Sequence, residues 1–93
     1  MRVGLLSLSL HLVGVTSLKE KRSILKRIVA DVGRAPYLAI GEVGAQDDLR
    51  RAELRIAHIS TDARRAQSVL MKWTQAFERE KQIDVEKVDV EIL

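Results

Sequence analysis

The sequence predicts an α+β fold of the ferredoxin-like kind, with the element order β-α-β-β-α-β. Four segments alternate apolar and polar residues, as half-buried strands do, and two segments repeat apolar residues at helical spacing. This order is typical of a two-layer sandwich, in which two helices cover one face of a four-stranded antiparallel sheet. The 93 residues suit a single domain, residues 1–93, because a chain of this size builds one core.

The first strand is expected over residues 3–13, where leucines alternate with serines and a histidine. Gly14 interrupts this pattern, and Ser17-Leu18-Lys19-Glu20 then has the form of a capping box, in which serine and glutamate satisfy free amides at a helix start. An amphipathic, basic helix should follow. Gly33 can end it, and Pro36 prevents its return.

Two strands at residues 37–43 and 52–59 should form a hairpin around the polar turn at 44–50. Ser60-Thr61-Asp62 supplies capping residues for a second helix, whose apolar positions continue to Phe77. In the last strand the apolar residues move from odd to even positions near Glu86-Lys87. This shift predicts a β-bulge.

Composition narrows the functional classes. The absence of cysteine excludes disulfides, thiolate metal sites and a cysteine nucleophile. No apolar run approaches the roughly 18 residues of a membrane span, and the first residues lead into a strand pattern instead of a signal peptide. We therefore expect a soluble, cytoplasmic protein without a membrane partner, metal or cofactor. Arginine outnumbers lysine ten to six, and asparagine is absent, which is compatible with a heat-adapted source.

The most unusual local feature is a group of three cations in the first turn of the first expected helix: Lys19, Lys21 and Arg22. Cations are unfavourable there, because a helix start already carries partial positive charge. The cluster therefore suggests a site for a phosphate or carboxylate group, with Lys26 and Arg27 extending it along the helix. The alternative is that these side chains are solvated and that Lys21, which projects towards the apolar arc, extends past the core edge.

Other polar residues give weaker indications. Alternation places His11 on the open face of the sheet and His58 on the core face, so the two should not share a metal or an acid–base role. The acidic turn with Glu42, Asp47 and Asp48 could bind a hard cation, but it lacks the spacing of a calcium loop, and a solvated hairpin turn is the simpler interpretation.

Apolar side chains should also gather on the open face of the sheet, away from the helices. If the alternation on the third strand is right, they include Ala57 and the interface candidates Val3, Leu5, Tyr37, Ala39 and Ile59. Contiguous exposed apolar surface usually marks an interface, so a homodimer or another docked partner is expected there. If the alternation is wrong, Ala57 and Ile59 lie in the core instead.

The segment from Ser17 to Arg22 after the first strand, and residues 41–47 after the second, resemble the YlxP-like family, a bacterial family of unknown function. The resemblance extends over nearly the whole chain, including residues 51–54 and 90–93. It implies a ferredoxin-like fold and, because such proteins tend to be encoded beside translation and ribosome-assembly factors, a role near RNA or the ribosome. It brings no catalytic residues. Leu49-Arg50 departs from the tryptophan and glutamine that relatives often carry.

Three functions follow as hypotheses. The first is a non-catalytic module that contacts RNA or a ribosomal component through the basic first helix. The second is a homodimeric interaction or regulatory module that uses the open sheet face and holds a small anion. The third is an acylphosphatase-like hydrolase, which is disfavoured because Gly14-Val15-Thr16-Ser17 does not resemble that enzyme's phosphate loop.

Overall fold

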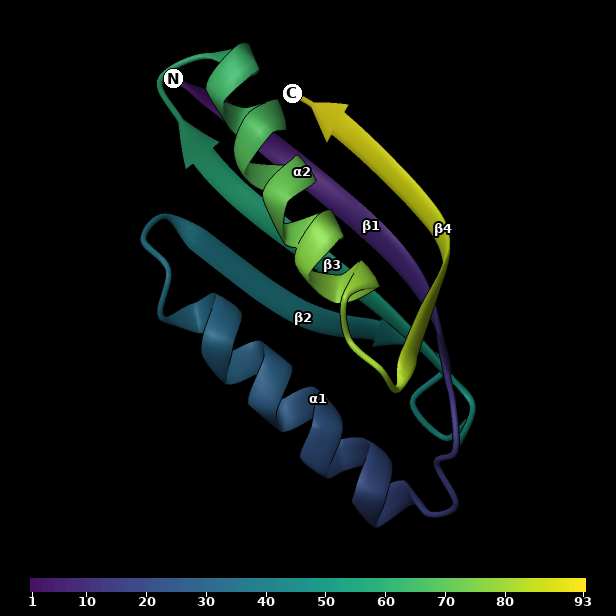
Figure 1. The fold of residues 1–93 in the computed structure, drawn as a ribbon. Helices are drawn as coiled ribbons and strands as arrows, with labels where there is room; N and C mark the ends of the chain where they lie inside the picture. The colour runs from purple at the N-terminus through teal and green to yellow at the C-terminus, as the bar shows by residue number, and fades with distance from the viewer.

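The computed structural model describes residues 1–93 and contains the six elements in the expected order (Figure 1). All strand pairs are antiparallel, and the sheet order is β2-β3-β1-β4, with both helices packed against one face. This arrangement confirms the ferredoxin-like α+β fold. The elements are β1 (Arg2–Leu12), α1 (Leu18–Gly33), β2 (Leu38–Gly44), β3 (Arg51–Ser60), α2 (Ala63–Glu78) and β4 (Ile83–Ile92).

Side-chain caps begin both helices. The Ser17 hydroxyl accepts a hydrogen bond from the Glu20 amide at 3.1 Å, as the capping box predicts. The Glu20 carboxylate accepts from the amide and hydroxyl of Thr16, one residue earlier than the capping box predicts. In α2, Asp62 is the capping residue, and its carboxylate accepts from the Arg65 amide at 2.8 Å.

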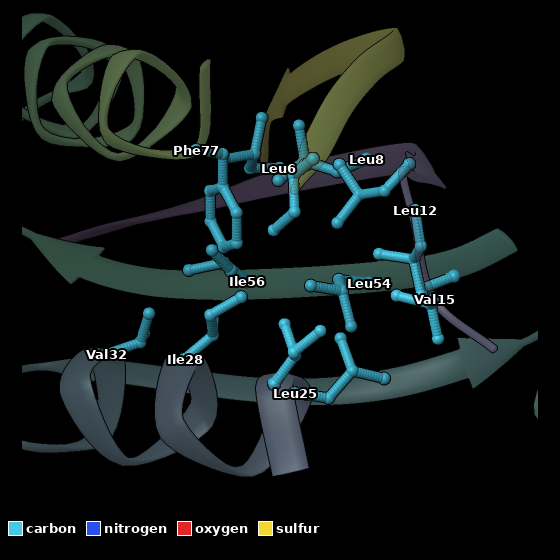
Figure 2. Packing of buried hydrophobic residues seen from close by; sticks show 14 of the residues in the cluster. Leu6, Leu8, Leu12, Val15, Leu25, Ile28, Val32, Leu54, Ile56 and Phe77 are labelled. Carbon is cyan, nitrogen blue, oxygen red and sulfur yellow. The ribbon is translucent and has the colours of Figure 1, made fainter. Parts of the chain in front are cut away.

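The core lies between the helices and the sheet, and Figure 2 shows its packing. The even-numbered leucines of β1 point towards the helices, and Leu54 and Ile56 of β3 continue this layer. From the helix side, Leu25, Ile28 and Val32 of α1 and Phe77 of α2 close it. The stripe of buried residues at spacings of three and four explains why α1 folds against the sheet.

Two bulges set the strand registers. Ser9 pairs with Lys87 but Leu10 pairs with Val85, so Glu86 is the extra residue, which confirms the predicted bulge. A second bulge was not predicted: Glu42 pairs with Leu54 and Gly44 with Glu53, which leaves Val43 unpaired. Glu42 lies before this bulge and shares the core side with its partner Leu54, in the same alternation as Ile40, whereas the bulge moves Gly44 to the face of Glu53.

The alternation on β3 is as expected, so Ala57 and Ile59 stay out of the core. They pair with Leu5 and Val3 of β1 on the face opposite the helices. Ala39 extends the same face through its pairing with Ala57. Ile59 keeps 47% of its surface exposed, whereas Val3 and Leu5 are half-buried.

Tyr37 departs from the expectation. Its φ of +62° places it outside strand geometry, and β2 starts one residue later, at Leu38. The residue lines a groove with Val69 and Trp73 of α2. Strand alternation therefore gives no reason to count Tyr37 among the residues of the open face.

Gly4 of β1 allows α2 to approach the sheet closely. A Cβ atom there would lie 2.8 Å from Leu70 Cδ1 and 3.3 Å from Ala66 Cβ, and both neighbours are fully buried. We expect Gly4→Val to lower the free energy of unfolding by about 1–3 kcal/mol, measured by urea denaturation. Gly41→Val is the matched control, because nothing lies within 4 Å and valine suits a strand. An equal loss in both variants would contradict this account.

Candidate functional site

The cation cluster at the start of α1 separates into one buried side chain and two exposed ones. Lys21 continues the buried stripe formed by Ile24, Leu25 and Ile28, and it is only 1% exposed. Its aliphatic stem packs as a core residue does, and only the ammonium group needs polar partners. Lys19 and Arg22 lie on the solvent side of the same turn.

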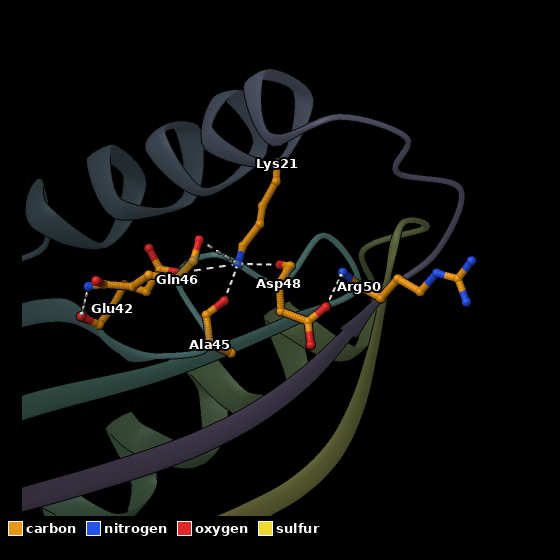
Figure 3. Close-up of polar contacts among 6 residues, drawn as sticks. All are labelled: Lys21, Glu42, Ala45, Gln46, Asp48 and Arg50. Atoms are coloured by element: carbon orange, nitrogen blue, oxygen red, sulfur yellow. Dashed lines mark hydrogen bonds and ion pairs between the residues drawn. The ribbon is translucent and has the colours of Figure 1, made fainter.

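The turn between β2 and β3 supplies the partners of Lys21 (Figure 3). The ammonium nitrogen donates to the carbonyl oxygens of Ala45 at 2.6 Å, Asp48 at 2.7 Å and Gln46 at 3.5 Å. It also lies 3.4 Å from Glu42 Oε2. These three carbonyls and the Glu42 carboxylate are called the Lys21 cradle below. The cradle joins α1 to the β2–β3 hairpin.

Local backbone geometry forms the cradle. Ala45 has a φ of +57°, and the Asp48 amide donates back to the Ala45 carbonyl at 3.1 Å, which closes a tight turn. The Asp48 carboxylate accepts from the Arg50 amide at 2.9 Å, so it braces the turn (Figure 3). The regular alternation of β2 places Glu42 on the core side, opposite Leu54. Together these features direct backbone oxygens at one point beneath α1.

The cradle changes the interpretation of two sequence features. Lys21 is neither solvated nor extended past the core edge, and its ammonium already has internal acceptors, so it offers no free donor to an outside anion. The acidic turn does hold a cation, but the cation is the chain's own lysine. The signal for this contact was a lysine in the apolar arc of an amphipathic helix.

The other expected cations of α1 divide in the same way. Lys19, Arg22 and Lys26 are exposed, and none lies within 4.0 Å of a carboxylate of this chain. Arg27 instead donates two hydrogen bonds to the Glu80 carboxylate, at 3.2 and 3.1 Å. These bonds and the charge of Glu80 raise the pKa of the Arg27 guanidinium above its ordinary value. Arg27 therefore links α1 to the residues after α2.

Basic and acidic residues are distributed unequally between α2 and β4. In α2, Arg64, Arg65 and Lys72 are exposed and Glu78 is the only acidic residue. β4 has the opposite balance, with Lys87 as its only cation. The acidic residues of β4 are Asp84, Glu86, Asp89 and Glu91. The helix layer is therefore the more basic part of the molecule.

The two histidines lie on opposite faces, as expected. His58 is buried, and its Nδ1 lies 3.2 Å from the Tyr37 carbonyl oxygen. His11 lies on the open face with Nδ1 3.8 Å from Oδ2 of Asp84, the residue paired with it on β4. The sequence pattern did not indicate this neighbour, because alternation gives the face of a residue but not its partner on another strand. No group of three histidine, aspartate or glutamate side chains gathers as a metal site would require.

Comparison with known proteins assigns this chain to a family. The family described as a protein of unknown function, DUF503, matches residues 3–91. The chain belongs to the DUF503 family. It is also 44% identical over 45 residues to the uncharacterised protein YlxP of Bacillus subtilis strain 168. That match covers 48% of this chain and 49% of the relative, so it spans about half the length of the curated protein. The resemblance to the YlxP-like family is thereby confirmed.

Membership of DUF503 brings no assigned chemistry. Leu49-Arg50, the departure from the family pattern, comes directly after the Lys21 cradle, where the Arg50 carbonyl accepts from the Leu12 amide at 2.7 Å. Neither helix of this DUF503 chain is long and apolar enough to cross a bilayer. The exposed cations of the helices and the open face of the sheet are accessible to solvent.

Proposed function

We propose that this DUF503 protein is a non-catalytic module that binds the phosphate backbone of RNA, on the ribosome or one of its precursors, through α1. The observation that carries the proposal is a row of three exposed cations without internal partners. We call Lys19, Arg22 and Lys26 the α1 stripe. The family resemblance, which implies a role near RNA or the ribosome, supports the choice of polyanion.

The spacing of the α1 stripe suits a phosphate chain. Positions separated by three and four residues lie on one side of a helix, and Lys19 and Lys26 are about 10 Å apart along the axis at 1.5 Å per residue. Each unpaired cation near the helix start also raises the local positive potential, which an external anion would offset. Arg27 of the same helix differs from these three residues, because it forms an ion pair with Glu80.

Exposed cations on α2 can lengthen this surface. Arg64, Arg65 and Lys72 are solvent-accessible, and no carboxylate of the chain lies within 4.0 Å of them. Affinity for RNA would then come from charge, with release of counterions as each phosphate is neutralised. Such binding is independent of base sequence, so we expect shape and charge of the RNA to decide the partner.

A hydrolase function receives less support. The acylphosphatase-like hypothesis depends on Lys21 as the group that contacts phosphate. Its ammonium instead donates to backbone carbonyls and lies beside Glu42. Moving Lys21 to a substrate would leave the cradle oxygens without their partner, at a cost of about 1–3 kcal/mol for each buried group.

The proposal predicts a steep salt dependence of RNA binding. In filter-binding titrations with ribosomal RNA, replacement of Lys19, Arg22 and Lys26 by alanine should reduce the slope of log affinity against log salt by about two, given about 0.7 per phosphate contact on single strands. The three residues are exposed, so the variant should fold normally.

The matched control removes the same charge elsewhere, with alanine at Arg50, Arg79 and Lys81. These residues are also exposed and lie outside the stripe. The control should keep the salt slope of the unmodified protein. Absence of binding at low salt, or an equal change of slope in both variants, would overturn the proposal.

A further inference from the structure

The open face of the sheet carries an ordered charge pattern. On β3, Glu53 and Arg55 point away from the helices, and on β4 Lys87 and Asp89 do the same. Ser9 of β1 pairs with Glu53 on one side and Lys87 on the other, and Ser7 pairs with Arg55 and Asp89. At each of these two levels, β3 and β4 therefore bear opposite charges. We call these four charged residues the charge quartet.

The charge quartet has no partners within the chain. Its four side chains are exposed and take part in no ion pair within 4.0 Å and no side-chain hydrogen bond. The short serines between the two charged strands leave a hollow of about 490 Å³, lined by the quartet and by Val43. One level further along, Arg51 does reach across to Glu86 of β4, at 3.4 Å. The four residues of the charge quartet therefore lack ion-pair partners within the chain, unlike Arg51 and Glu86.

An apolar surface continues from the quartet towards the other end of the same strands. It consists of Val3, Leu5, Ala39, Ala57 and Ile59. One face of the sheet therefore combines an apolar patch with a group of unpaired charges. A partner for this face must present apolar residues and alternating charges in the matching order.

We propose that the partner is a second copy of this chain, docked face to face around a two-fold axis parallel to β1. This rotation places β3 of one copy over β4 of the other. Glu53 then faces Lys87 of the second copy and Arg55 faces its Asp89, and symmetry repeats both contacts. The same rotation lays Val3 and Leu5 of β1 on the same two residues of the second copy, while Ala57 of β3 comes to lie over β4. Aligned packing of two sheets is a common arrangement.

The direction of the axis matters. A two-fold axis perpendicular to β1 also opposes unlike charges, since Glu53 would face Arg55, but it moves the two apolar patches away from each other. Three strands of each copy overlap, and strands of about ten residues at about 3.3 Å per residue and about 4.8 Å apart then give about 475 Å² per copy. A standard interface buries about 800 Å² per partner, so we expect an affinity in the micromolar range. This surface lies on the side of the sheet opposite α1, so the inference goes beyond the proposed RNA contact and does not depend on it.

Complementation between two charge-reversed variants tests the inference. In Arg55→Glu, the new carboxylate faces Asp89 of the second copy, and in Asp89→Arg the new guanidinium faces Arg55. Each variant alone should dimerise at least about tenfold more weakly than the unmodified chain, because like charges meet twice. An equal mixture should recover the dimer, since each introduced charge then meets its opposite. Sedimentation velocity across micromolar to millimolar concentration measures this.

The mixture of the two variants distinguishes this dimer from two alternatives, a purely intrachain role of the quartet and a dimer with a perpendicular axis. If the quartet only stabilised each sheet from within, mixing two chains would restore nothing. With the perpendicular axis the mixture would still oppose like charges, because the residue at position 55 faces Glu53. Lys72→Glu on exposed α2 is the matched control and should dimerise as the unmodified chain does. A monomer at every concentration, or no recovery on mixing folded variants, would overturn the inference.

Discussion

Replacing Lys21 with methionine should lower the free energy of unfolding by about 3 kcal/mol, at the lower end of the usual range for breaking a buried ion pair. Methionine keeps the apolar stem, so the loss comes from the ammonium. The carbonyl oxygens of Ala45 and Asp48 lose their donor, and Glu42 keeps a carboxylate without a counter-ion. The Glu42 side chain is 27% exposed, so water partly solvates its carboxylate and limits the loss of unfolding free energy.

Thermal unfolding followed by circular dichroism measures this effect. A loss of about 3 kcal/mol in a domain of this size corresponds to a fall in Tm of about 12–24 °C. Lys19→Met is the matched control, because it removes the same charge from the same helical turn at an exposed position. It should change stability by less than about 0.5 kcal/mol. Equal Tm values for the two variants would show that the cradle contributes nothing to stability.

Phe77→Ala should have a comparable effect, with a loss of about 3–5 kcal/mol of unfolding free energy. The ring is 3% exposed and points from α2 to Leu6 and Ile56 across the centre of the core (Figure 2). Truncation removes its buried apolar surface and leaves a cavity between α2 and the sheet, which the strands cannot close without breaking their register.

Urea denaturation of the Phe77→Ala variant measures the loss, with Met71→Ala as control. Met71 lies on the same helix, but half of its surface is exposed. The control should stay within about 0.5 kcal/mol of the unmodified protein. If both substitutions cost the same, the core would not be centred where Figure 2 shows it.

The order of elements was predictable, because burial imposes periods of two residues in strands and 3.6 residues in helices, and the alternating leucines of β1 and the apolar face of α1 display these periods directly. The bulge at Glu86 was predictable for the same reason: apolar residues flank it at both odd and even positions. The bulge at Val43 left no such record. β2 ends at Gly44, directly after this bulge, so no apolar residues follow it in the strand to display the change of face.

The sequence did not predict the Lys21 cradle, for a different reason. Its oxygens belong to the backbone of Ala45, Gln46 and Asp48, and backbone carbonyls leave no residue-type signature. The sequence displays both halves of the contact, a lysine among apolar positions and a polar turn, but nothing in it shows that 24 residues of chain bring Ala45 beneath Lys21. Similarly, Tyr37 fits an alternating pattern, and only its positive φ removes it from β2.

The extra residue in β4 has a consequence for assembly. β4 lies at an edge of the sheet, where free amides and carbonyls would accept a strand from another chain. The kink at Glu86 interrupts that row of groups, and the four carboxylates of the strand repel an identical neighbour. Growth of the sheet into fibrils by strand addition at β4 is therefore disfavoured. Two copies of the chain can still meet through the open face of the sheet.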